Sequence, residues 1–156
     1  MKKLSTILVT VLAVIILTGK VYAQQSIRVA QFNTENGLAL QGYDPVTYFT
    51  QNKAIKGQKE LAVVEEGITY YFATVQDKEL FKKDYKKYEP QYGGWCAYAM
   101  GATGDKINID PETFKIEDGK LYLFYHSWVN NTLNKWNADE KNLKSKADAS
   151  WAKYIK

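Results

Sequence analysis

The sequence is poor in the residues that form covalent and metal-bound frameworks. Its 156 residues include one cysteine, Cys96, and one histidine, His126. A single thiol cannot form an intramolecular disulfide, so packing must stabilise the fold. No pair of residues has zinc-site spacing, and neither a phosphate-binding loop nor a pair of catalytic carboxylates is evident. Cys96 is therefore either a buried apolar residue or a reactive or ligating group.

The sequence also lacks an apolar run long enough to span a membrane comfortably. The longest run, Ile7–Leu17, follows Lys2 and Lys3 and precedes Val21-Tyr22-Ala23. A basic start, a short apolar stretch and small residues before a cleavage point are typical of a secretory signal peptide. We therefore expect residues 1–23 to be removed, leaving an exported protein, periplasmic or secreted, without a stable membrane anchor. No cysteine follows the run, so lipidation is not expected.

Net charge is scarce once this segment is set aside. The whole chain carries a formal charge of +4, but Lys2, Lys3 and Lys20 supply three of its 21 basic residues. The remainder has 18 basic and 17 acidic residues. A nearly neutral protein has no general electrostatic attraction for nucleic acid or anionic lipid, so neither is an expected partner.

What remains predicts one domain rich in aromatic residues, which make up 14% of the chain. Residues 24–36 are polar and form a lead-in, with an edge strand expected at Ile27–Val29. The domain proper spans residues 37–156, a length that suits a single core.

Two hairpins and several helices predict an α+β fold. The first hairpin pairs Leu61–Val64 with Ile68–Phe72, and the second pairs Thr113–Glu117 with Lys120–Tyr125 around Asp118-Gly119, a pair that suits a type I′ turn. The segment from Leu121 to Tyr125 is apolar on both faces, which indicates a central strand. We expect a further strand at Tyr43–Phe49 and, overall, a small antiparallel sheet of hairpins with short helices.

Three helices are predicted. Thr74 and Asp77 have the spacing of a capping box, which starts a helix that carries Phe81 and Tyr85. A short helix over Trp95–Met100 ends at Gly101. A C-terminal amphipathic helix carries an apolar stripe and is capped by Asn137 with Glu140; the stripe comprises Leu143, Ala147, Trp151, and Tyr154 or Ile155.

Four segments of the sequence form a recognisable series: Gly42–Phe49, then Tyr70–Phe72 followed by Phe81 and Tyr88, then Tyr92–Ala97, then Gly119–Leu123. In this order they resemble the sequences of exported YHS domain-containing proteins. The resemblance covers nearly all of the chain after the lead-in. It implies a small α+β domain associated by analogy with metals, copper especially.

The chain departs from that family at its ligands. Metal-linked members resemble a pattern with thiols where this sequence has Thr47, Ala73 and Asp77. A hydroxyl, a methyl group and a carboxylate cannot replace a soft thiolate cluster. The resemblance therefore implies a retained scaffold without its usual metal site.

Three residues remain as candidate metal ligands. On a short helix Cys96 and Met100 would share one face, and a thiolate, a thioether and the His126 imidazole would suit Cu(I). The alternative is that Cys96 and Met100 fill the core and His126 is a hydrogen-bonded residue at a strand end. A Cys–His hydrolase is a further alternative, oriented by Asn130, Asn131 or Asp44.

The candidate ligand-binding residues are Asp44, Tyr92, Gly93 and Gly94. Asp44-Pro45 otherwise shapes a turn, and the two glycines otherwise supply a tight bend. The preferred hypothesis is an extracytoplasmic YHS-like binding protein without an enzymatic role, whose expected ligand is a metal ion, with copper favoured, or a small molecule. The alternatives are a thiol-dependent enzyme or redox protein that uses Cys96, and a purely structural, partner-binding domain.

Overall fold

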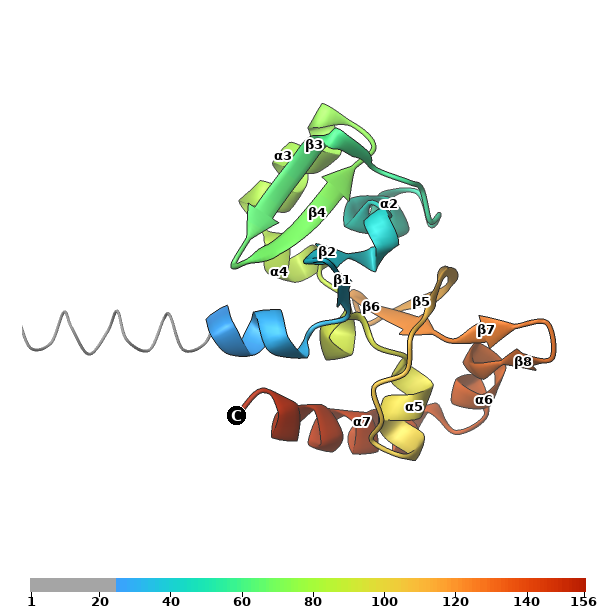
Figure 1. Cartoon of the computed structure of the whole chain (residues 1–156). Coiled ribbons are helices and arrows are strands. Elements are labelled where there is room, and N and C mark those ends of the chain that lie inside the picture. The colour runs from blue at the N-terminus through green and yellow to red at the C-terminus, as the bar shows by residue number, and fades with distance from the viewer. Residues whose placement is uncertain (1–24) are drawn as a thin grey trace, which may run out of the picture.

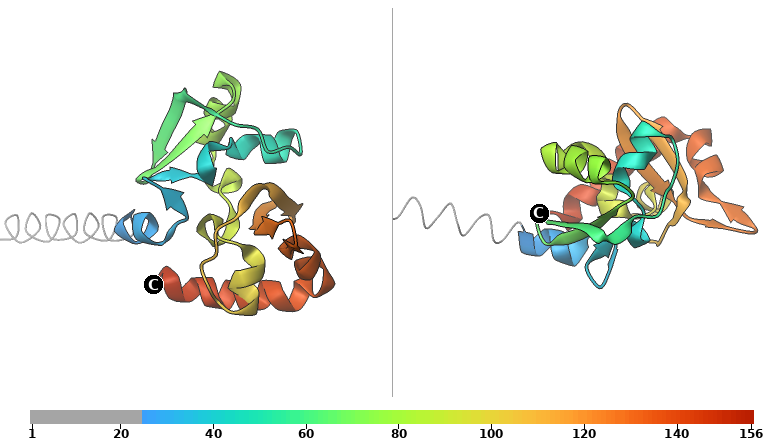
Figure 2. Two further views of the ribbon diagram at one scale, coloured as in Figure 1. Left: turned by 45° about the vertical axis from the view of Figure 1, so that its right-hand side comes forward. Right: turned by 90° about the horizontal axis from the view of Figure 1, so that it is seen from above.

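A computed structural model describes residues 25–156, and the fold is α+β as predicted (Figure 1). The signal peptide predicted over residues 1–23 lies outside the described part. Figure 2 shows that the helix formed by residues 25–31 and the C-terminal end of the chain lie on the same side of the molecule. None of the described helices has the length and apolar character needed to cross a membrane.

The N-terminal half is built on a four-stranded sheet in the order β1-β2-β4-β3. The β2–β4 contact is parallel and the other two pairings are antiparallel, so this sheet is mixed rather than purely antiparallel. Its strands and helices are β1 (Thr34–Glu35), β2 (Leu38–Ala39), η1 (Leu40–Gly42), α2 (Pro45–Thr50), β3 (Gln58–Glu65), β4 (Ile68–Phe72), α3 (Val75–Lys83) and α4 (Tyr85–Tyr88).

The C-terminal half combines two hairpins with helices that pack on one another. The hairpins are β5–β6 and β7–β8, and the closest helix pair is α5 with α7. The elements are η2 (Gln91–Gly94), α5 (Ala97–Ala102), β5 (Asp110–Glu117), β6 (Lys120–Phe124), β7 (His126–Ser127), β8 (Asn130–Asn131), α6 (Thr132–Ala138) and α7 (Glu140–Tyr154).

Strand β6 lies between two hydrophobic clusters. Leu121 and Leu123 join the cluster that contains β4 and α3, whereas Tyr122 and Phe124 join the cluster around Trp136. Successive side chains of a strand point to opposite faces, so one strand serves both clusters. This arrangement explains the strand's apolar pattern on both faces.

Both predicted hairpins are confirmed. Strand β3 pairs with β4, and β5 pairs with β6. At the second turn Asp118 has φ 52° and Gly119 has φ 69°, which is the pair of positive values that a type I′ turn requires.

The strand predicted at Tyr43–Phe49 is wrong, because this segment contains helix α2. Asp44 is its N-cap and accepts a hydrogen bond from the Val46 amide at 2.8 Å, while Pro45 occupies the first helical turn. An Asp-Pro pair is a helix-start signal, since aspartate accepts a free amide and proline has none to satisfy. This helix-start signal is present in the sequence and favours α2 over the predicted strand.

The edge strand predicted at Ile27–Val29 is also wrong, because residues 25–31 are helical. The Phe32 amide donates to the Arg28 carbonyl, and the Arg28 guanidinium lies 4.4 Å from the centre of the Phe32 ring. Residues four apart share a helix face, so the helix is what permits this contact.

The predicted helix ends are partly confirmed. Thr74 accepts from the Asp77 amide at 3.0 Å and donates to the Asp77 carboxylate, so the capping prediction holds. Asn137 does not cap the last helix, which begins at Glu140 after Asp139. Gly101 does not end α5 but lies within it, where a Cβ would stand 2.4 Å from the Leu143 carbonyl oxygen. This glycine permits the close packing of α5 on α7.

Candidate functional site

The loop that carries Tyr92, Gly93 and Gly94 joins the two halves of the protein. All three residues have positive φ, and the Tyr92 hydroxyl donates to Asp148 of α7 at 2.9 Å. A Cβ on Gly93 would lie 2.7 Å from the Trp151 ring. Tyr92 and Gly93 are therefore committed to packing against α7. They also line a cavity of about 250 Å³ beside Asp148 and Trp151. Gly94 borders a different cavity, of larger volume.

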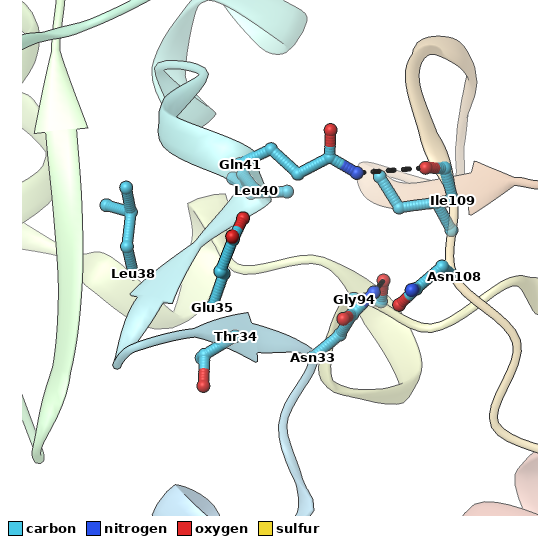
Figure 3. A pocket seen from close by; sticks show the side chains of 9 residues that line it. All are labelled: Asn33, Thr34, Glu35, Leu38, Leu40, Gln41, Gly94, Asn108 and Ile109. Atoms are coloured by element: carbon cyan, nitrogen blue, oxygen red, sulfur yellow. Dashed lines mark hydrogen bonds between the residues drawn. The ribbon is translucent and has the colours of Figure 1, made fainter.

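This cavity has a volume of about 340 Å³ and is shown in Figure 3. We call it the Gly94 cavity. Segments far apart in the sequence form its walls: the β1–β2 hairpin, η1, the Gly94 loop and the segment before β5. Its lining residues are Asn33, Thr34, Glu35, Leu38, Leu40, Gln41, Gly94, Asn108 and Ile109.

Two hydrogen bonds tie the polar side chains of this cavity to its walls. The Asn33 side-chain amide donates to the Gly94 carbonyl at 3.0 Å, and the Gln41 side-chain amide donates to the Ile109 carbonyl at 3.0 Å (Figure 3). The Asn33 backbone amide donates to the Gly93 carbonyl. These bonds fix the cavity wall without using the side-chain amide oxygens.

Cys96 does not line the Gly94 cavity. Its side chain is fully buried, and its sulfur accepts a hydrogen bond from the Tyr125 amide at 3.3 Å. The Thr132 hydroxyl lies 3.5 Å from the same sulfur. The thiol is thus a partnered core group at the start of α5, where Cys96 is the N-cap residue.

The other two predicted metal ligands lie in different surroundings. Met100 is fully buried in the cluster around Trp136, whereas Cys96 belongs to the cluster on the other face of β6. The His126 side chain is 43% exposed, and its Nδ1 lies 3.2 Å from the Asp110 carboxylate. Across residues 25–156 no group of three His, Cys, Asp or Glu side chains is arranged to hold a metal ion.

Asp44 is buried and serves the fold. One carboxylate oxygen caps α2 at the Val46 amide, and the other accepts from the Ala73 amide at 2.7 Å. Burial raises the pKa of the Asp44 carboxyl to about 6, although these two amides oppose the rise. Asp44 is absent from the lining of the Gly94 cavity.

Thr47, Ala73 and Asp77 converge on Asp44. The Ala73 amide bonds its carboxylate, the Thr47 hydroxyl donates to its backbone carbonyl at 2.9 Å, and the Asp77 charge adds to its raised pKa. Distant parts of the sequence thus meet at one buried point. The residues present there supply oxygen and methyl groups and no sulfur.

Arg28 forms a second polar centre that the sequence did not predict. Its guanidinium makes two hydrogen bonds to Glu89, and its Nε lies 2.9 Å from a Glu66 carboxylate oxygen. The Tyr70 hydroxyl donates to the same Glu89 carboxylate at 2.6 Å. This centre holds the N-terminal helix against the sheet.

The tip of the β7–β8 hairpin bears on the partner-binding alternative. Trp128 and Val129 are almost wholly exposed there. They stand next to one another on a two-residue turn, flanked by uncharged side chains.

Sequence reasoning found one of the nine residues that line the Gly94 cavity. It selected Gly94 but missed four polar side chains that line the cavity with it, Asn33, Glu35, Gln41 and Asn108. These residues belong to no motif and meet only through the fold. A weak signal existed at Asn36-Gly37, where φ is positive at both residues and the chain reverses between β1 and β2.

No family model, curated protein or solved structure matches this chain.

Proposed function

We propose that this chain is an extracytoplasmic binding domain of YHS-like architecture that holds a small ligand in the Gly94 cavity and has no catalytic role. The observation that carries the proposal is the cavity itself. Its volume of about 340 Å³ falls within the range of small-molecule sites. Only three of its nine lining residues have apolar side chains, so its walls are more polar than those of most small-molecule sites and suit a polar ligand.

The arrangement around Asp44 supports the YHS-like part of the proposal. Thr47, Ala73 and Asp77 match three thiol positions of the related pattern and all contact or influence one carboxylate. Such convergence is expected if the scaffold is shared and its former ligand positions have been replaced. The extracytoplasmic part rests on the signal peptide predicted over residues 1–23.

Closing the cavity from its rim tests the binding role. Asn108 lines the cavity and is exposed, so Asn108→Trp is expected to fill it without disturbing the core. Ile107 is exposed on the same segment and outside the lining, which makes Ile107→Trp the matched control. A small-molecule library is screened by amide chemical-shift changes. Ligands should move the Glu35 and Gly94 resonances in the parent and Ile107→Trp proteins but not in Asn108→Trp.

Copper binding at Cys96 is a second candidate, favoured by one contact. The Tyr125 amide bonds the Cys96 sulfur, so the thiol touches the residue immediately before His126. Thiolate, thioether and imidazole are ligands that Cu(I) accepts. Because Cys96 and Met100 are fully buried and His126 is exposed, loading would require the β6–β7 junction to open.

The copper candidate is tested by titrating the reduced protein with Cu(I) against a competing chelator. Cys96→Ala, Met100→Leu and His126→Gln remove the candidate ligands one at a time. The other methionine of the sequence, Met1, belongs to the predicted signal peptide and does not interfere. A ligand role requires each variant to bind more weakly than the parent. Equal affinity in the parent and Cys96→Ala proteins would falsify copper binding at this site.

The alternative of a thiol-dependent enzyme or redox protein has less support. The Cys96 sulfur is bonded to Thr132 and Tyr125, and His126 is paired with Asp110. A thiol nucleophile needs a base within hydrogen-bond reach, and no such contact joins the two side chains in the described structure. Iodoacetamide alkylation of the folded protein at pH 8 tests this alternative, and rapid reaction there would restore it.

A further inference from the structure

The chemistry of the Gly94 cavity walls points to a particular class of ligand. Among the lining residues in the described structure, Glu35 is the only charged one. It is exposed, and no lysine or arginine of residues 25–156 pairs with it. A carboxylate beside a cavity without a protein cation attracts a positively charged ligand.

Two of the three carboxamides in the wall, those of Asn33 and Gln41, add acceptors rather than donors. The amide nitrogens of Asn33 and Gln41 are already bonded to backbone carbonyls. A carboxamide oxygen has two lone pairs, and neither oxygen receives a hydrogen bond within the part of the chain described here. The wall therefore offers two amide oxygens and a carboxylate to a ligand that donates hydrogen bonds.

A lysine bonded to η1, Lys56, does not pair with the carboxylate of this wall. The Lys56 ammonium is bonded to the Gln41 backbone carbonyl at 2.8 Å and lies 4.2 Å from the centre of the Tyr43 ring. It is absent from the cavity lining. Lys56 thus directs its charge to η1 and Tyr43 rather than to Glu35.

Three apolar side chains complete the wall beside Thr34, Gly94 and Asn108. Leu38, Leu40 and Ile109 line the cavity, and Figure 3 shows them distributed around the polar groups. An ammonium group has three donors for the acceptors of Glu35, Asn33 and Gln41, and the Thr34 hydroxyl and Asn108 carboxamide can also accept. A short hydrocarbon body matches the leucine and isoleucine surfaces. We propose that the Gly94 cavity binds a small organic cation with a primary ammonium group and a short apolar body. This inference rests on the binding role proposed above.

Three probes of one size separate charge from shape. n-Butylammonium, n-butanol and n-butyrate carry the same hydrocarbon chain with a positive, neutral or negative end. Each is titrated into the protein at constant ionic strength while amide chemical shifts are recorded, and calcium chloride is a fourth arm. The inference expects n-butylammonium to move the Glu35, Gly94 and Asn108 resonances with the highest affinity of the four.

The variants test which group recognises the ammonium. Glu35→Gln keeps the size and removes the charge, and it should weaken n-butylammonium binding about tenfold, the effect expected for losing one charged hydrogen bond. Glu60→Gln is the matched control, since Glu60 is also exposed and lies on β3 outside the lining. The control should bind like the parent protein.

The outcomes distinguish this inference from the binding role. Tighter binding of n-butanol, n-butyrate or calcium, or equal binding by Glu35→Gln, overturns the cation inference and leaves the cavity as a binding site. If neither these probes nor the wider library move the cavity resonances, the binding role fails and the inference fails with it. Selective binding of n-butylammonium that Glu35→Gln weakens supports both.

Discussion

Asp44 shows how a buried residue gives the protein a pH-dependent stability. Its pKa is raised by burial to about 6, whereas an unfolded aspartate titrates near 3.9. A group whose folded pKa is raised stabilises the protein fully below the unfolded value, and this contribution is lost as pH rises through the folded value. Asp44 therefore favours the folded state more at pH 4.5 than at pH 7.

The variant Asp44→Asn tests this sign. Asparagine still caps helices but does not titrate. The free energy of unfolding of the parent minus that of the variant should increase by about 2 kcal/mol between pH 7 and pH 4.5. Urea unfolding at the two pH values measures it. Comparing the two proteins cancels the acid loss from other carboxylates, and a constant difference contradicts the assignment.

Arg28 supplies a second prediction. With Glu89 it forms an ion pair whose side chains are 13% and 11% exposed. Removing one partner leaves a largely buried charge, so Arg28→Met should lower the free energy of unfolding by about 3 kcal/mol. Removing both charges in Arg28→Met/Glu89→Gln should recover part of the loss.

The control for Arg28 is an exposed ion pair. Lys82 pairs with Glu79 three residues earlier on α3, with both side chains about half exposed. Lys82→Met should change the free energy of unfolding by less than about 0.5 kcal/mol. Urea unfolding of all variants gives the comparison, and similar losses for Arg28→Met and Lys82→Met would argue against a buried pair.

For individual residues, the sequence predicts roles that depend on neighbours in the chain better than roles that depend on distant segments. Thr74 and Asp77 are three apart, and their capping was read correctly. Glu35, Asn33 and Asn108 become neighbours only when the β1–β2 hairpin meets the segment before β5. A local sequence pattern does not specify such tertiary contacts, so the cavity could not be predicted from the sequence.

The loop that carries Tyr92, Gly93 and Gly94 joins the two halves of the protein, and its backbone conformation limits which residues it can contain. Gly93 has φ 60°, and a Cβ there would lie 2.7 Å from Trp151 and 3.1 Å from Phe32. Gly119 has φ 69° with open space around it, so it shares the backbone strain without the crowding. Gly119→Ala should cost about 1 kcal/mol, and Gly93→Ala about 1–3 kcal/mol more.

Thermal or urea unfolding of the two alanine variants measures that difference. Equal losses would mean that Trp151 moves aside freely and that the loop is not locked to α7. If Gly93→Ala lowers the free energy of unfolding more than Gly119→Ala does, it should also weaken ligand binding, because the neighbouring Gly94 borders the cavity.

Element prediction succeeded where periodicity was long and failed where a segment was short. The hairpins and the C-terminal helix follow clear patterns, and the structure contains them. Residues 25–31 and α2 span few turns. The start of α2 is marked only by Asp44-Pro45, and the helix of residues 25–31 is marked only by Arg28 and Phe32, whose spacing of four suits a helix. Short apolar runs suit either strand or helix until tertiary contacts decide.

Buried tyrosines limit the stability of the whole molecule at alkaline pH. Burial raises the pKa of Tyr48 and Tyr70, and burial with the neighbouring Asp148 charge raises that of Tyr92. In the unfolded chain these phenols titrate near 10. Stability is therefore complete below that pH and falls above it, by about 1.4 kcal/mol per pH unit for each such phenol.

Urea midpoints measured between pH 9 and pH 11 should show this fall. Tyr92→Phe should make the fall shallower, since one ionising group is removed. Tyr98→Phe is the control, because the Tyr98 side chain is only partly buried. If the Tyr92→Phe slope equals that of the parent protein, Tyr92 ionises in the folded state.

The path of β6 has a consequence for how the protein folds. Leu121 and Leu123 belong to one hydrophobic cluster, and Tyr122 and Phe124 belong to the other. The strand is therefore part of both cores. A one-residue deletion at the Asp118-Gly119 turn would exchange the two sets of side chains and spoil both clusters together. The chain should consequently unfold in a single cooperative transition, and a cut at this turn should yield no fragment that folds alone.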